Sequence, residues 1–297
     1  MRNSFKKNKL RSIPWISGII LVVAAFMCVI PFLLVISISF SSEAAIKAFG
    51  YTFIPREFTL TAYRYVFSNW ERILTSYVVT TASTIIGTVL SVLIMALMAY
   101  PLSQRSYANR KPVTFMLAFT MLFSGGLVPS YILITQYLHL KDNFLVLIIP
   151  NLVSAFHVIL MRTFFQDISP SIRESAKVDG CSEFRILFQI IFPLSKPSIA
   201  TIALLQMIAR WGDWYTCLLY INNDNLMTLQ YFMQSIMSNI ELMKTQMANL
   251  PMGHVEDIPT ESARMAMALI TAGPMIFVFP FFQKYFVKGL TVGAVKG

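Results

Sequence analysis

Three long stretches of this 297-residue chain contain no Lys, Arg, Asp or Glu, and they constrain its fold more than any other feature. They run from Ile73 to Gln104, from Pro112 to Leu140 and from Asn143 to Met161. About 20 consecutive apolar residues form a helix long enough to cross the roughly 30 Å hydrocarbon core of a bilayer. Because the backbone must satisfy its own hydrogen bonds there, the sequence predicts an all-α membrane protein.

The composition favours a single membrane domain over residues 1–297. Hydrophobic residues make up 56% of the chain and charged residues only 13%, against roughly 25% charged residues in soluble proteins. We expect six spans, at residues 14–40, 73–101, 112–138, 143–161, 198–222 and 265–283. The segments outside the spans include a short N-terminal tail at 1–13 and two long loops at 162–197 and 223–264.

The basic residues are distributed unevenly between the two sides of the membrane that six spans would define. Segments on the side of the N-terminus carry 16 Lys and Arg, and those on the other side carry 7, whereas the acidic residues number 4 and 9. Since Lys and Arg near span ends favour the cytoplasm, both termini are predicted to be cytoplasmic. The basic N-terminus followed by a long apolar run resembles a signal peptide, but the run exceeds a usual signal core, so we expect an uncleaved first span. The net charge of +10 is thus a topology signal rather than a nucleic-acid-binding surface.

The loop at 162–197 carries the signals of a short helix. Ser171 and Glu174 have the spacing of a capping box, and Pro170 just before them is typical of a helix start. Gly180 can end that helix because glycine tolerates the left-handed conformation. A capped helix with charges of both signs favours docking to a protein; the alternative is a helix that lies along the lipid headgroups.

A second, amphipathic helix is predicted to follow the glycine. Ser182 can begin it and Pro193 can end it. Its apolar residues fall at positions i, i+3, i+4 and i+7, and they are Phe184, Leu187, Phe188 and Ile191. The loop is therefore expected to form a helix, a glycine turn and a second helix that leads back to the membrane.

The same loop resembles the EAA loop of ABC importer permeases. That pattern is Glu-Ala-Ala, three residues, Gly, nine residues, Ile, any residue and Leu-Pro; Glu174, Gly180 and Pro193 keep its spacing. Ser175 and Phe192 depart from it mildly. The resemblance implies that the loop couples to an ATPase through Glu174, Ser175, Ala176, Lys177, Asp179, Gly180, Ile190 and Pro193.

Further segments resemble the carbohydrate-type branch of these permeases, most closely the Gram-positive oligosaccharide permeases of the LplC and YtcP type. They are residues 124–129, 211–214, 283–289 and 293–297, so the resemblance covers essentially the whole chain. It implies the type I ABC importer transmembrane fold and a carbohydrate, in particular an oligosaccharide, as substrate. It also implies a multi-pass protein of a bacterial plasma membrane, in a Gram-positive organism.

The resemblance further implies the partners. They are a second homologous permease subunit that forms a heterodimer with this chain, two ATPase subunits that bind ATP and Mg, and an extracellular sugar-binding protein. The chain itself would be a transport subunit without catalytic residues, metal or cofactor, and no GxxxxGK[ST] phosphate loop occurs in it. Glu174 would contact basic groups in the ATPase cleft, Gly180 would permit the turn, and Ala176 would allow close approach to the ATPase.

Two charged residues lie inside the fifth expected span. Charges such as those of Arg210 and Asp213 are costly in a membrane and usually face a cavity or a partner. Trp211 and Trp214 flank them, and aromatic rings beside polar groups suit sugar passage, so all four are candidates for the translocation pathway. The alternative is a structural ion pair between the two charges, which are three residues apart. His157, on an apolar face of the fourth expected span, is more typical of a packing residue.

The external loop at 223–264 is predicted to contain a helix that packs on the protein or rests on the bilayer. Its apolar residues at helical spacing are Leu226, Leu229, Met233, Ile236, Met237 and Ile240. Other functions stay open at this point: an ABC permease for a non-sugar solute, or an ion-coupled secondary transporter, for which we find no convincing internal repeat. A membrane enzyme is less favoured, because the three histidines are scattered along the chain.

Overall fold

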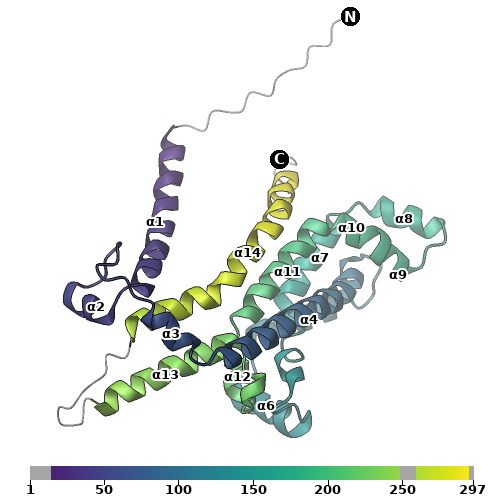
Figure 1. Cartoon of the computed structure of the whole chain (residues 1–297). Helices are drawn as coiled ribbons and strands as arrows, with labels where there is room; N and C mark the ends of the chain where they lie inside the picture. The colour runs from purple at the N-terminus through teal and green to yellow at the C-terminus, as the bar shows by residue number, and fades with distance from the viewer. Residues whose placement is uncertain (1–14, 248–258, 294–297) are drawn as a thin grey trace, which may run out of the picture. The chain divides into compact units, whose positions relative to one another are not determined.

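The computed structural model describes residues 15–247 and 259–293, and in these ranges the chain is helical, with no strand beyond an isolated bridge between Ser41 and Phe58. The expected tail at 1–13, residues 248–258 of the external loop and residues 294–297 lie outside the described part. The residues form two compact units, Met1–Ser68 with Met243–Ile270, and Asn69–Leu242 with Thr271–Gly297. Figure 1 shows the helices of both units.

The first unit contains the N-terminal helices and the beginning of the last one. Its elements are α1 (Trp15–Ser39), α2 (Glu43–Phe49), α3 (Thr61–Phe67) and the start of α14 (Glu261–Gly293). The buried carboxylate of Glu43 accepts hydrogen bonds from the backbone N–H groups of Glu261 at 3.1 Å and Ser262 at 3.4 Å. Those N–H groups have no partner within their own helix, so Glu43 caps the start of α14.

The second unit is built around the long helix α4. Its elements in chain order are α4 (Trp70–Ser103), α5 (Arg110–Leu122), α6 (Leu127–Ile132), η1 (Leu133–Tyr137), η2 (Phe144–Leu147), α7 (Ala155–Gln166), α8 (Pro170–Val178), α9 (Glu183–Arg185), η3 (Ile186–Ile191), α10 (Phe192–Leu194), α11 (Lys196–Trp211), α12 (Tyr215–Tyr220), η4 (Asp224–Leu226) and the first part of α13 (Leu229–Met247), followed by the remainder of α14.

The buried face of α4 consists mainly of small residues, and α7 and α11 pack against this helix. Small side chains let neighbouring helices in a membrane approach closely. The small buried residues in the first two thirds of α4 are Ser76, Thr80, Ser83, Thr84, Gly87, Thr88 and Ser91. Toward its C-terminal end the same helix joins a hydrophobic core that also includes Met161 and Phe165 of α7, both completely buried.

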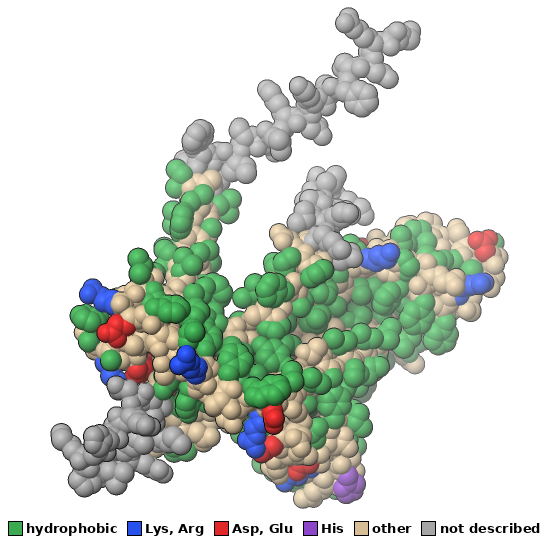
Figure 2. Space-filling view, viewed as in Figure 1, with side chains coloured by type: hydrophobic (Ala, Val, Ile, Leu, Met, Phe, Trp, Pro, Cys, Tyr) green, Lys and Arg blue, Asp and Glu red, His purple; other side chains and the backbone are tan. Residues whose placement is uncertain are grey.

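Three of the six expected spans are confirmed as continuous helices within the described residues. The segments Gly18–Ser39, Trp70–Ser103 and Glu261–Gln283 are long and apolar enough to cross a membrane. Two bent pairs raise the number to as many as five: Arg110–Leu122 with Leu127–Tyr137 at 112°, and Glu183–Leu194 with Lys196–Trp211 at 85°. In Figure 2 hydrophobic side chains cover the visible body of the second unit, and its charged side chains gather at two ends.

The third, fourth and fifth expected spans are not single helices; the third is the bent pair of α5 with α6 and η1. Residues 143–161 form the short 3-10 helix η2, an irregular stretch at 148–154 and only the first half of α7. Pro150 has no N–H to continue a helix, and Ser154 starts a new one by accepting a hydrogen bond from the His157 N–H. Residues 198–222 are likewise divided, because α11 ends at Trp211 and α12 begins at Tyr215.

The helix predicted in the external loop is confirmed as α13. Leu229 and Ile240 are fully buried and Met233 is 5% exposed, as expected for one packed face. Leu226 lies just before this helix, in η4.

Candidate functional site

The α8–α9 elbow, residues 170–185, lies at one end of the second unit, and α6 and α12 lie toward the other (Figure 1). Its first helix begins at Pro170, with Ser169 in the capping position. The expected capping box at Ser171 is therefore wrong: the Ser171 hydroxyl lies 2.8 Å from the Ser169 hydroxyl instead. Proline explains the earlier start, because its backbone angle suits the first helical position and it has no N–H to satisfy there.

The turn of the elbow has the predicted glycine geometry. Gly180 has a φ of +74°, in the left-handed region, which confirms its expected role. The Cys181 N–H donates to the Ala176 carbonyl at 3.0 Å, which closes the end of α8. Ser182 then caps α9 by accepting from the Arg185 N–H at 3.4 Å, as predicted.

The apolar stripe expected on the second helix is only partly confirmed. Leu187 and Ile191 are at most 2% exposed, but Phe184 is 68% and Phe188 is 41% exposed. The reason is that residues 186–191 form a π-helix, whose wider turn shifts the buried face toward Ile186. The helical run then continues through α10 to Leu194, one residue beyond the expected end.

The first helix of the elbow has an inner and an outer face. Arg173 and Ala176 are buried, at 9% and 3% exposed, and Ala176 belongs to the main hydrophobic core. Ala176 therefore packs on this chain's own core, and its small size permits that contact; its close approach to an ATPase stays a prediction. The exposed residues of α8 and its turn include Glu174, Ser175, Lys177, Val178 and Asp179.

Glu183 links the two helices of the elbow to α4, a role that no sequence pattern indicated. Its carboxylate forms an ion pair with Lys177 of α8 at 2.6 Å and accepts a hydrogen bond from the Tyr100 hydroxyl of α4 at 2.6 Å. Burial opposes ionisation of Glu183, but these contacts and a weaker one from Gln104 hold its pKa below the ordinary value. No pattern signalled this contact, because Tyr100 lies in a charge-free span 83 residues away.

Two further motif residues lie after the elbow. Ile190, in η3, is partly buried against the main core, and Pro193, in α10, is exposed. The structure thus places Ile190 in the anchor of the elbow rather than on its outer face.

Arg210 is buried at the end of α11, at 6% exposed, where it supports the irregular stretch after η2. Its guanidinium donates hydrogen bonds to the carbonyls of Leu147 at 3.2 Å and Asn151 at 2.7 Å, and to the Ser91 hydroxyl at 2.8 Å. A Cβ on Gly87 of α4 would lie 2.6 Å from the Arg210 Cζ, so this glycine makes room for the guanidinium. We call this arrangement the arginine-supported break.

Asp213 has other partners than the arginine expected to pair with it. It accepts hydrogen bonds from the Thr216 N–H at 3.0 Å and hydroxyl at 2.6 Å, and from the Asn151 side-chain amide at 3.2 Å. No ion pair joins Asp213 to Arg210 in the described part of the chain. The carboxylate thus caps the start of α12 and also faces the break.

The two tryptophans of this region differ in their surroundings. The Trp211 indole N–H donates to the Thr271 carbonyl at 2.8 Å, and its ring lies 6.3 Å from that of Tyr77. Trp214 is 40% exposed, as an aromatic surface for a solute would be. His157 packs as expected inside the unit, 3.0 Å from the Gln206 amide, a partner that the sequence did not indicate.

At the other end of the second unit, Asp142 joins two loops. Its carboxylate accepts hydrogen bonds from the backbone N–H groups of Asn222 and Asn223, which follow α12. The Asn222 N–H is the main reason that the pKa of Asp142 lies below its ordinary value. Within the described ranges, no three His, Cys, Asp or Glu side chains gather in a geometry that could hold a metal ion.

Residues 109–292, which include the elbow and the fifth expected span, match the family described as binding-protein-dependent transport system inner membrane component. The chain belongs to this family. The permease is 39% identical over 277 residues to the polygalacturonan/rhamnogalacturonan transport system permease protein YtcP of Bacillus subtilis, covering 93% of this chain and 96% of that one. It is 37% identical to protein LplC of the same organism, covering 91% and 90% of the two chains.

A solved structure resembles this permease over nearly its whole length. It is a bacterial ABC transporter involved in the import of the acidic polysaccharide alginate; the TM-score is 0.77 at 30% identity, covering 96% of this chain and 100% of the matched chain. The carbohydrate-type resemblance found in the sequence is thereby confirmed: the chain is a transmembrane ABC permease similar to sugar transport permeases.

Proposed function

We propose that this permease is the membrane subunit of an ATP-driven importer that carries a carbohydrate, in particular an oligosaccharide, into the cell. The observation that carries this proposal is the α8–α9 elbow, a helix with an exposed, charged outer face that is fixed to the membrane helices by its inner face. Such an element can pass the motion of a docked partner to α4 through the contacts of Arg173, Ala176 and Glu183. The relatives named for polygalacturonan, arabinooligosaccharides and alginate support the substrate class.

The proposed assembly follows from the family. The chain would pair with a second, homologous permease, and two ATPase subunits carrying ATP and Mg would bind at the elbow, chiefly at Glu174, Ser175 and Asp179. An extracellular binding protein would deliver the sugar. We further propose the type I importer fold in the plasma membrane of a Gram-positive bacterium, with residues 1–297 as one membrane domain, six crossings and both termini in the cytoplasm.

The arginine-supported break is the proposed place of the sugar pathway. Asn151 and Asp213 present polar atoms there, and Trp214 presents an exposed ring. The terminal nitrogens of Arg210 donate to backbone carbonyls and to the Ser91 hydroxyl, and the Trp211 indole donates to a backbone carbonyl, so we assign both residues to supporting the break rather than to binding sugar.

Gly180 offers a direct test of coupling through the elbow. The complete transporter, with this chain and its partner subunits, is reconstituted in liposomes, and ATP-dependent oligosaccharide uptake is measured. Gly180→Val should remove most of the uptake, because a β-branched residue is a severe outlier at φ +74° and the elbow must change shape.

Gly50→Val is the matched control. Gly50 has a similar φ of +73°, and a Cβ would meet nothing within 4 Å at either glycine, but Gly50 lies outside the elbow. This variant should keep its uptake per inserted protein. Equal uptake in the two variants, or uptake by the unmodified transporter that does not respond to ATP, would contradict the proposal. Competition by alginate, polygalacturonan and neutral oligosaccharides then separates the substrate classes.

A further inference from the structure

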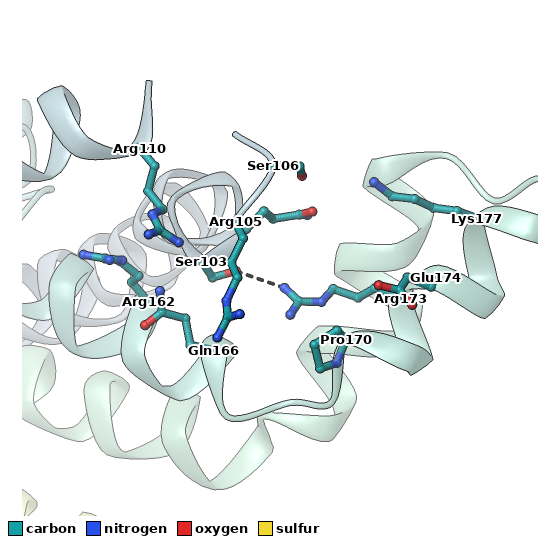
Figure 3. A pocket seen from close by; sticks show the side chains of 11 residues that line it. Ser103, Arg105, Ser106, Arg110, Arg162, Gln166, Pro170, Arg173, Glu174 and Lys177 are labelled. Carbon is teal, nitrogen blue, oxygen red and sulfur yellow. Dashed lines mark hydrogen bonds between the residues drawn. The ribbon is translucent and has the colours of Figure 1, made fainter. Parts of the chain in front are cut away.

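A cavity of about 770 Å³ lies behind the elbow, between the end of α4, the start of α5, the end of α7 and α8. It is lined by five basic side chains and one acidic side chain: Arg105, Arg110, Arg162, Arg173, Lys177 and Glu174. Figure 3 shows that Arg105 and Arg173 direct their guanidinium groups into the same space, with Arg110 and Arg162 on its other side. This excess of positive charge is unusual in a chain with only 13% charged residues.

The arginines of the cavity are not neutralised by the protein. Among the described residues, Lys177 has a carboxylate partner in Glu183, but none of the four arginines has one within ion-pair distance. Arg173 is only 9% exposed, and its single side-chain hydrogen bond is to the Ser103 hydroxyl at 3.4 Å. Arg173 is buried and Arg110 and Arg162 are partly buried, whereas Arg105 is exposed. Because buried charges are normally paired, the unpaired guanidinium groups around this space favour an anion from outside the chain.

Arg162 gives a second, independent indication of a missing partner. Its Nε is buried and has no hydrogen-bond partner, although one terminal nitrogen donates to the Thr114 hydroxyl at 3.3 Å. Burial and then the charge of the neighbouring Arg110 lower the pKa of Arg162. Two arginines therefore repel each other on one wall of the cavity, and an anion between them would relieve that repulsion.

We propose that this cavity binds a phosphate group, either the headgroup phosphate of an anionic phospholipid or a free phosphate anion. Guanidinium groups form paired, charge-assisted hydrogen bonds with phosphate oxygens, and several arginines around one space fit a doubly or singly charged tetrahedral anion. The site shares Glu174 with the outer face of α8 that is proposed to contact the ATPase, but its four arginines are not among the proposed ATPase contacts.

The surface next to the cavity favours the lipid source. Arg110 is the first residue of α5, and that helix is itself the first half of a bent pair long and apolar enough to cross a membrane. From there on, α5 and the residue after it expose large apolar side chains, which would accommodate acyl chains below a headgroup held by Arg110. These residues are Phe115, Met116, Phe119, Leu122 and Phe123, each 48% to 80% exposed.

Occupation of the site would have a mechanical consequence. The same anion would touch residues of α5 and α7 on one side and Arg173 of α8 on the other, so it would fasten the elbow to the membrane helices. Coupling would then depend on the lipid or phosphate around the transporter.

The test uses the purified complete transporter in nanodiscs and in detergent. Native mass spectrometry measures retained phosphatidylglycerol against phosphatidylcholine, and isothermal titration in detergent measures inorganic phosphate. The double variant Arg110→Gln/Arg162→Gln should bind the relevant anion at least about tenfold more weakly, because each lost charge-assisted hydrogen bond is worth about a factor of ten. Arg105→Gln, an exposed position, should weaken binding in the same direction if the double variant folds poorly.

The matched control is Arg185→Gln, an exposed arginine of the same elbow that does not line the cavity; it should bind as the unmodified protein does. If the cavity variants lose only phosphatidylglycerol retention, the bound phosphate belongs to a lipid. If they lose only binding of inorganic phosphate, it is a free anion. Unchanged binding of both anions in the cavity variants overturns the proposal. So does loss of the ATPase subunit from those variants with anion binding intact, because the cavity would then be a protein-docking surface.

Discussion

The α8–α9 elbow and the arginine-supported break both interrupt a helical protein with irregular backbone, but they are stabilised in opposite ways. In the elbow, Pro170, Gly180 and Ser182 set the start, the turn and the restart, and all three act on backbone within a few residues of themselves. In the break, Arg210 supports the carbonyls of Leu147 and Asn151, about 60 residues away in the chain.

This difference reflects what surrounds each interruption. The elbow is largely exposed, so water can satisfy backbone groups that the turn leaves open, and local residues only need to select the shape. The break, by contrast, surrounds a buried guanidinium, and a buried backbone carbonyl without a partner costs about 1–3 kcal/mol. A single arginine with several donors supplies the partners, which accounts for a charge at this position.

The largest effect is expected from Arg210→Gln, which should disrupt the arginine-supported break and leave the α8–α9 elbow intact. The shorter amide cannot reach both carbonyls and the Ser91 hydroxyl, so buried acceptors lose their donor. We expect destabilisation by about 3 kcal/mol or more. Denaturant-induced unfolding of the purified permease in detergent would measure it.

Lys196→Gln is the control for Arg210→Gln, because Lys196 is an exposed basic residue on the same helix. Its effect should stay within about 0.5 kcal/mol. Equal stability of the two variants would show that the guanidinium does not support the break.

A smaller effect is expected from Gly87→Ala. This substitution acts on Arg210 from the facing helix, α4. The new methyl would lie 2.6 Å from the Arg210 Cζ, so the guanidinium must shift and some of its hydrogen bonds must weaken. We expect the free energy of unfolding to fall by about 1–3 kcal/mol in the same assay.

Two comparisons test the assignment of the Gly87 effect. Gly273→Ala, in α14, places its Cβ where nothing lies within 4 Å and should be close to neutral. Gly87→Ala should lower the free energy of unfolding less in the Arg210→Gln background than in the unmodified protein, because the clash with the guanidinium is then absent. Additive effects would mean that Gly87 serves helix packing rather than the arginine.

The same contrast explains how much the sequence predicted. The spans at 14–40, 73–101 and 265–283 were predictable because a helix with lipid around it needs only length and apolarity. The breaks in the third, fourth and fifth expected spans were not, because a largely apolar run indicates burial and says nothing of helix continuity.

The candidate site shows the same contrast between local signals and long-range contacts. The glycine turn and the restart at Ser182 were predicted from local signals, whereas the inward position of Ala176 depends on which face of α8 meets the core. The roles of Tyr100, Glu183 and Asn151 depend on contacts between distant segments, which a single sequence does not display.

The smallest effect is expected from acid, and it should act on the elbow through Glu183. The pKa of Glu183 in the folded protein lies below its value of 4.5 in an unstructured chain, so its contacts stabilise the elbow above that value. This contribution is lost as the pH falls through the lowered pKa, when protonation removes the ion pair with Lys177. Hydrogen exchange of residues 176–190, corrected for intrinsic rates, should then show a modest loss of protection as the pH falls below 4.5. Glu183→Gln should abolish that pH dependence, because the amide keeps a hydrogen-bond acceptor for Tyr100 but cannot titrate. An equal acid response in the variant would assign the effect to other carboxylates.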